Sequence, residues 1–131
     1  MLCCILYCTA ACRTIAEINQ EAAQAAGLPE GALIRLAELI GQLSDGVEFR
    51  LQSAQKVTNL QAIFDFYPSI EADEIWCTVW RSDTFTWALG VYRNDDQWVD
   101  AFNGYMSPNS DIDVRHAEVW RAAGCTNFLN P

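Results

Sequence analysis

The sequence has few lysines and histidines and no basic cluster. Its only lysine is Lys56 and its only histidine is His116, and 17 acidic residues against 8 basic ones give a net charge of −9. Proteins that bind nucleic acid or anionic membranes directly depend on clustered Lys and Arg. We therefore expect no direct contact with nucleic acid or membrane, and we expect the partner to be a basic protein surface.

Familiar catalytic and cofactor motifs are also absent. The sequence contains no Gly-rich phosphate loop, no H-E-x-x-H and no G-x-S-x-G. The run Asn109-x-Asp111-x-Asp113 starts like a calcium loop, but Val114 stands where such a loop needs Gly. These absences predict a protein that is not an enzyme and that uses no cofactor or metal.

The cysteines are distributed unevenly. Four of the six lie within residues 1–12, and only Cys77 and Cys125 lie elsewhere. Secreted disulfide frameworks spread Cys along a loop-rich chain, whereas 51% of this chain is apolar. Residues 1–12 lack the preceding Lys or Arg of a signal peptide and are shorter than the ~20 residues of a membrane span. The sequence therefore predicts a cytoplasmic protein with reduced cysteines, in which residues 1–12 are part of the folded chain.

The region 13–45 has the pattern of two consecutive helices. Thr14-Ile-Ala-Glu17 matches a capping box at a helix start, and Gly27 and Pro29 separate this helix from a second with its own apolar stripe. Because the connection is very short, we expect a helical hairpin whose apolar face covers a sheet.

The most informative stretch is 74–102. Aromatic and β-branched residues form three runs, Glu74–Arg81, Thr84–Arg93 and Gln97–Phe102, and polar turn residues separate them. This pattern is typical of an antiparallel meander.

A two-residue turn at Ser82-Asp83 would place Trp80 opposite Phe85 and Trp76 opposite Leu89. Since side chains alternate along a strand, one face of the sheet would then be aromatic and the other small and apolar. The residues expected on the small face are Ile75, Cys77, Val79, Thr86 and Ala88. Neither face resembles a solvent face, so both need cover.

The remaining segments complete the prediction of a single α+β domain. Val47–Ser53 alternates as a strand does, the segment 55–67 favours a short helix, and Asp113 is a candidate N-cap for a last helix, Val114–Ala123. Loops are expected at Asn103-Gly104 and at Ser107-Pro108-Asn109. The predicted fold is an antiparallel three- to four-stranded β-meander covered by an N-terminal helical hairpin and a C-terminal helix. Its parts are an apolar Cys-rich segment (1–12), the hairpin (13–45), the sheet region (47–103) and the C-terminal helix (113–124).

In such a meander, the start of the first strand and the second turn lie at the same end of the sheet. The acidic residues gathered there and a neighbouring tryptophan form the candidate partner-binding site: Glu71, Asp73, Glu74, Asp95, Asp96, Asp100 and Trp98. Opposite charge steers association and buried aromatics add affinity. Asp and Asn also favour turns for local backbone reasons, so a solvated turn is the competing interpretation.

These features lead to a hypothesis of function. We predict a small acidic protein-binding module that occupies a basic, nucleic-acid-binding surface of a larger protein. Phage and mobile-element inhibitors of the anti-CRISPR or DNA-mimic type share this size and charge, and the comparison rests on those two properties alone. One alternative is a small thiol-dependent enzyme that uses Cys125 and His116. Another is a structural homodimer joined through the aromatic sheet face.

Overall fold

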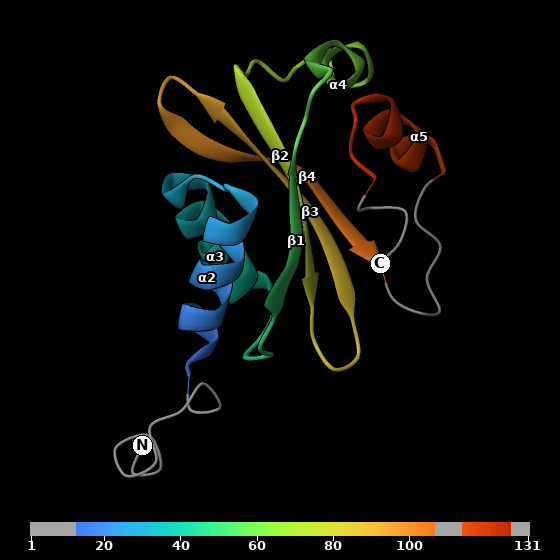
Figure 1. Cartoon of the computed structure of the whole chain (residues 1–131). Coiled ribbons are helices and arrows are strands. Elements are labelled where there is room, and N and C mark those ends of the chain that lie inside the picture. Colours follow the sequence, from blue (N-terminus) through green and yellow to red (C-terminus); the bar gives the residue numbers. More distant parts are fainter. Residues whose placement is uncertain (1–12, 107–113, 127–131) are drawn as a thin grey trace, which may run out of the picture.

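A computed structural model describes residues 13–106 and 114–126 of the chain (Figure 1). The elements, in chain order, are α2 (Ile15–Ala26), α3 (Glu30–Leu43), β1 (Arg50–Lys56), α4 (Leu60–Phe66), β2 (Glu74–Arg81), β3 (Thr86–Asn94), β4 (Gln97–Met106) and α5 (Val114–Ala122). The predictions for residues 1–12, for the loop at Ser107-Pro108-Asn109 and for an N-cap at Asp113 fall outside the described residues.

The four strands form one antiparallel sheet in the order β1-β2-β3-β4. Helices α2 and α3 lie on one side of it, and α4 and α5 lie on the other (Figure 1). The predicted α+β fold is confirmed. In the part of the chain that the structure describes, no helix is both long and apolar enough to cross a membrane.

The helix boundaries follow the capping signals in the sequence. Thr14 Oγ1 accepts a hydrogen bond from Glu17 N at 3.1 Å, and Glu17 Oε1 accepts one from Thr14 N at 3.3 Å. The Thr14 hydroxyl also donates to Glu17 Oε1 at 2.9 Å, and this side-chain hydrogen bond, together with the one from Thr14 N, lowers the pKa of the Glu17 carboxyl. Gly27 ends α2 in the left-handed conformation, at φ 79°. Its N–H donates to the carbonyl oxygens of Ala23 and Gln24 in the last turn. The predicted capping box and glycine stop are both confirmed.

The β2–β3 connection is longer than the two-residue turn predicted from the sequence. Ser82 N donates to Phe85 O at 2.8 Å, and Ser82 Oγ accepts from Phe85 N at 3.0 Å, which closes a four-residue loop. Trp80 therefore pairs with Trp87, and the predicted pairing with Phe85 is wrong. The error is two residues, and side chains alternate with period two, so the residues within β2 and β3 remain on their predicted faces, while Phe85 lies in the loop.

Two other predicted boundaries are also wrong. Strand β1 begins at Arg50 and not at Val47. Asn103-Gly104, expected in a loop, lies inside β4, where Gly104 pairs with Ala88. A bulge opposite Gly90 shifts the register of β4 before this point, and beyond it β4 stays paired with β3 through a dipeptide that usually marks a turn.

The aromatic face of the sheet packs under α2 and α3. Trp76 is 6% exposed and Trp80 is 1% exposed. The buried residues of this core are Ala23, Leu28, Ala32, Leu36, Ile40, Phe49, Leu51, Trp76, Trp80, Leu89 and Val91. The homodimer alternative needs this face at the surface of the molecule. In this structure the chain's own helices cover it.

A second core lies on the opposite face, beneath α4 and α5. Its buried residues are Val57, Ile63, Ile75, Cys77, Val79, Ala88, Trp120, Ala123 and Cys125. Cys77 and Cys125 are joined in a disulfide, with their Cα atoms 6.7 Å apart. The expectation of reduced cysteines is therefore wrong for this pair, because the docking of α5 brings together two residues 48 positions apart.

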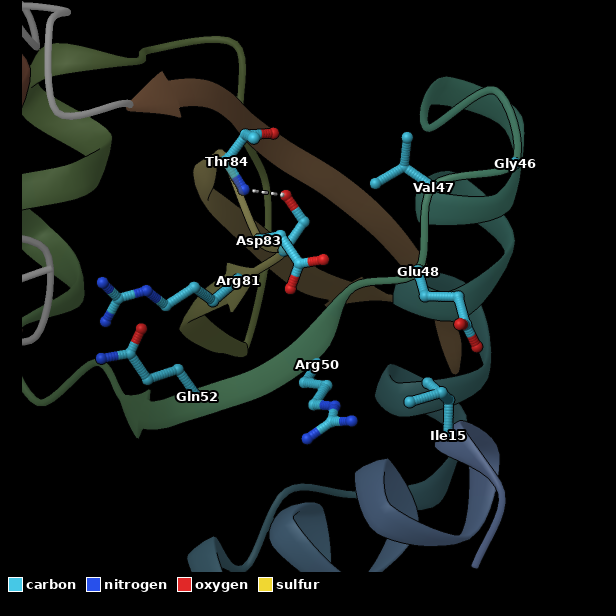
Figure 2. Close-up of a pocket in the computed structure, with 10 residues that line it drawn as sticks. Ile15, Gly46, Val47, Glu48, Arg50, Gln52, Arg81, Asp83 and Thr84 are labelled. Atoms are coloured by element: carbon cyan, nitrogen blue, oxygen red, sulfur yellow. Dashed lines mark hydrogen bonds between the residues drawn. The ribbon is translucent and has the colours of Figure 1, made fainter.

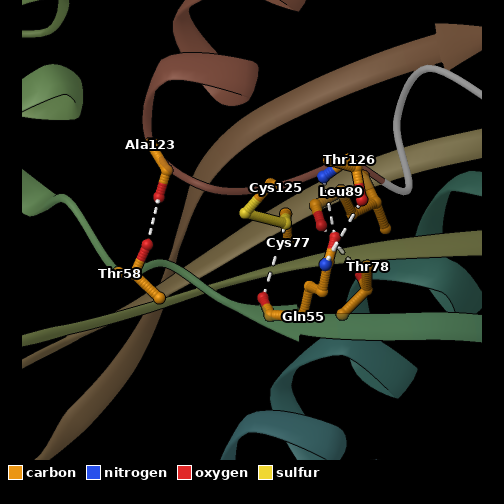
Figure 3. The surroundings of a disulfide bond; sticks show 8 residues. All are labelled: Gln55, Thr58, Cys77, Thr78, Leu89, Ala123, Cys125 and Thr126. Carbon is orange, nitrogen blue, oxygen red and sulfur yellow. Dashed lines mark hydrogen bonds between the residues drawn. A yellow bond between two sulfur atoms is a disulfide. The ribbon is translucent and has the colours of Figure 1, made fainter.

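The C-terminal end of α5 is fastened to the corner between β1 and α4 (Figure 3). Ala123 O accepts hydrogen bonds from Thr58 N at 3.0 Å and from Asn59 N at 3.1 Å. Farther on, Gln55 Oε1 accepts from Thr126 N at 2.8 Å. Gly124 has φ 96°, and a Cβ there would collide with the Thr58 hydroxyl, so the turn after α5 requires glycine.

Helix α2 is attached to the sheet through Asn19. Its Nδ2 donates to Phe49 O at 3.2 Å, and its Oδ1 accepts from Leu51 N at 2.9 Å. Asn19 thereby holds the entrance of β1 against the first helix.

Candidate functional site

The acidic end of the sheet is built by the register of three strands. Glu74 pairs with Arg93 across β2 and β3, and Asn94 pairs with Gln97 at the start of β4. The β3–β4 turn, Asp95-Asp96, therefore begins two residues after Arg93, the residue that faces Glu74. The predicted convergence of the start of β2 and the second turn at one end of the sheet is confirmed.

Arg93 neutralises part of this acidic end. It forms a two-pronged pair with Asp73, Nε to Oδ1 at 3.1 Å and Nη2 to Oδ2 at 3.1 Å, and it lies 3.6 Å from Glu74 Oε1. The guanidinium lowers the pKa of the Asp73 carboxyl, chiefly through these hydrogen bonds. Both carboxylates are thus engaged within the chain.

Glu74 also has a structural role. Trp76 Nε1 donates to Glu74 Oε2 at 2.7 Å, and the glutamate side chain is only 15% exposed. One oxygen holds an indole of the core and the other faces Arg93. The sequence places Glu74 among the partner contacts, but its carboxylate is occupied inside the protein.

Trp98 packs against helix α3 and is half-buried. Its indole ring crosses α3 at Gly31, where an added Cβ would lie 2.7 Å from Trp98 Cδ1. The Arg93 guanidinium lies 5.9 Å from the centre of the same ring. Asp100, two residues farther along β4, is 3.7 Å from Arg35 of α3. The tryptophan predicted as an exposed anchor therefore serves first to join β4 to α3.

This close approach gives a testable prediction. Gly31→Ala is expected to destabilise the protein by about 1–3 kcal/mol, because the new methyl group must displace the Trp98 ring. Gly41→Ala in the same helix is the matched control, since nothing lies within 4 Å of a Cβ at that position. That change is expected to stabilise the helix by about 0.5–1 kcal/mol. Urea unfolding measures both effects, and equal midpoints for the two variants would contradict the contact.

Three carboxylates of the acidic end are exposed and form no ion pair among the described residues: Glu71, Asp95 and Asp96. Asp95 and Asp96 form the tip of the β3–β4 hairpin, at φ 51° and 64°. Both positions of such a two-residue turn require the left-handed conformation, which Asn-Gly adopts most easily. The chain instead places two negative charges at the tip. We call Glu71, Asp95 and Asp96 the acidic tip.

A cleft lies at the other end of the sheet, between the entrance of β1 and the β2–β3 turn (Figure 2). It has a volume of about 880 Å³. Its lining combines two arginines, two carboxylates, three uncharged polar residues, one glycine and two aliphatic side chains: Ile15, Gly46, Val47, Glu48, Arg50, Gln52, Arg81, Ser82, Asp83 and Thr84.

Arg50 and Arg81 are direct partners in the β1–β2 register. Both are exposed, and neither forms an ion pair with a described residue. The sequence shows no basic cluster here because Arg50 and Arg81 are 31 positions apart and are brought together only by strand pairing. A correct β1 boundary and the bulge at Gln52, where the register shifts between Leu51 and Ser53, would have been needed to find them.

The residues of the thiol-enzyme alternative are placed only in part. The Cys125 sulfur is bonded to Cys77 and is fully buried, so it offers no thiolate while the bond persists. The His116 side chain lies outside the described residues. In the described ranges, no group of three His, Cys, Asp or Glu side chains is arranged to hold a metal ion.

Comparison with known proteins identifies no relative. No family model, curated protein or solved structure matches this chain.

Proposed function

We propose that this chain is a small acidic module, without catalytic activity, that binds a basic surface of a larger protein. The observation that carries the proposal is the pair of aspartates at the hairpin tip. Asp95 and Asp96 occupy left-handed positions that other residues fill more easily, and both residues are exposed. A net charge of −9 adds long-range attraction to a cationic partner.

The rest of the acidic end supports this arrangement. The Asp73–Arg93–Glu74 contacts and the packing of Trp98 fix the base of the hairpin, so the tip projects from a rigid support. Charges that are held in place before binding lose less conformational entropy in the complex. The proposed partner surface is one that otherwise binds nucleic acid, since closely spaced carboxylates can occupy sites that bind phosphates. The specific proposal of an anti-CRISPR or other DNA-mimic inhibitor rests on size and charge.

The test compares two double variants of equal charge. Asp95→Asn/Asp96→Asn removes two charges from the tip, and Asn tolerates the left-handed turn. Asp65→Asn/Glu118→Gln removes two exposed charges from α4 and α5. Each immobilised variant is used at low salt to capture proteins from a lysate of the native host. We expect the wild type and the α4/α5 variant to retain a nucleic-acid-binding protein that salt and added DNA release, and the tip variant to retain much less.

Equal recovery of the same protein by both double variants would reject the tip as the binding site. Recovery that resists salt would reject electrostatic capture, because attraction between exposed charges is screened by added ions.

A further inference from the structure

Arg50 and Arg81 lie at the end of the sheet opposite the acidic tip, where an anion could bind to both. Residues directly opposite each other in an antiparallel pair project from the same face with Cβ atoms about 5 Å apart, and like charges there are destabilising. Arg50 and Arg81 occupy such positions, and their side chains extend in different directions (Figure 2). The chain has more carboxylates than basic groups, yet none of those described is ion-paired with either guanidinium. An external anion reached by both guanidinium groups would accept charge-assisted hydrogen bonds from each of them.

The two side chains border the cleft from different sides (Figure 2). Arg81 extends towards Gln52, and Arg50 extends towards Ile15. Both side chains are exposed and flexible, so their guanidinium groups can turn towards a common oxygen pair without moving the backbone.

The other groups in the cleft restrict which anion fits. Glu48 and Asp83 line the same hollow and repel any anion, but they repel a doubly charged phosphate more strongly than a singly charged carboxylate, so a single carboxylate is favoured over phosphate. Ile15 and Val47 provide aliphatic surface beside the arginines, and Val47 is 45% exposed. A volume of about 880 Å³ is within the range of small-molecule sites.

We propose that this cleft binds a small carboxylate ligand with an apolar body. Arg50 and Arg81 hold the carboxylate, and Ile15 and Val47 contact the apolar part. The site lies at the opposite end of the sheet from the acidic tip. Ligand binding in the cleft can therefore be tested independently of the proposed partner binding.

Hippurate is a suitable probe, since it joins one carboxylate to an apolar ring, and hippuramide is its uncharged control. Both are titrated into the full chain while backbone amide signals are followed by NMR. We expect saturable shifts with hippurate at Arg50, Gln52, Arg81 and Thr84, and none with hippuramide. The absence of saturable shifts at these residues overturns the proposal, as does an equal response to hippuramide. A stronger response to inorganic phosphate overturns the assignment to a carboxylate.

Arginine variants identify the groups that hold the anion. Arg50→Gln and Arg81→Gln, singly, are each expected to weaken hippurate binding about 10-fold or more, because each removes charge-assisted hydrogen bonds. Arg121→Gln changes an exposed arginine of α5 by the same charge and is expected to leave the affinity unchanged. Equal weakening by Arg121→Gln assigns the binding to net charge and overturns the site. Unperturbed amide spectra elsewhere show that each variant is folded.

Discussion

Breaking the Cys77–Cys125 disulfide is expected to lower the free energy of unfolding by about 4 kcal/mol. The bond closes a loop between residues 48 positions apart, and a loop of this length removes that much chain entropy from the unfolded state in the loop-closure treatment. The loss approaches the whole stability of a small domain, which is typically about 5–15 kcal/mol. Urea unfolding with and without a reductant measures the difference.

The double variant Cys77→Ala/Cys125→Ala is the control for this experiment. It lacks the bond, so added reductant should leave its unfolding midpoint unchanged, while the wild type loses stability under the same conditions. Peptide mapping of the unreduced protein should find the two residues in one linked fragment. A wild-type midpoint that does not respond to reductant, together with no linked fragment, would show that the bond does not form.

Trp80→Ala is expected to destabilise the protein by about 3–5 kcal/mol, since it leaves a large cavity in the core under α2 and α3. Trp80 is 1% exposed, and its Nε1 donates to Thr78 Oγ1 at 2.9 Å. Thr78 Oγ1 in turn donates to Leu89 O at 2.8 Å. The indole is thus both packed and hydrogen-bonded, and alanine loses both contributions. Chemical denaturation monitored by far-ultraviolet circular dichroism measures the change.

Two milder variants separate packing from hydrogen bonding. Thr78→Val leaves the buried indole N–H without its acceptor and is expected to destabilise the protein by about 1–3 kcal/mol. Ile34→Ala on α3 changes a side chain that is 53% exposed, and we expect an effect within about 0.5 kcal/mol. A cost for Trp80→Ala no greater than that for Ile34→Ala would contradict the buried position of the tryptophan.

The sequence predicts those parts of the fold that depend on local signals. The Thr14 capping box and the Gly27 stop act over a few residues, and both are found where expected. The alternation of large and small side chains in β2 correctly assigns its two faces. The exact strand pairing is not predicted, because it depends on the Ser82 hydroxyl, whose hydrogen bonds favour a four-residue loop over a two-residue turn.

Features formed by two segments that are distant in the sequence cannot be predicted from such local patterns. The Cys77–Cys125 bond depends on where α5 docks, and Arg50 meets Arg81 only after β1 has paired with β2. The sequence predicts the acidic end in outline, since one strand start and one turn suffice to place it. It does not predict the contacts of Glu74 and Trp98 inside the chain, because their partners Trp76 and Gly31 are set by side-chain packing.

The amide of Asn19 has a consequence for how this protein behaves at high concentration. Its donor and acceptor make the same two contacts with Phe49 and Leu51 that the backbone of an adjoining strand would make. A foreign strand cannot add to the sheet at that point, because the groups it needs are already satisfied. The Asn19 side chain therefore blocks strand addition at the start of β1, the strand at one edge of the sheet.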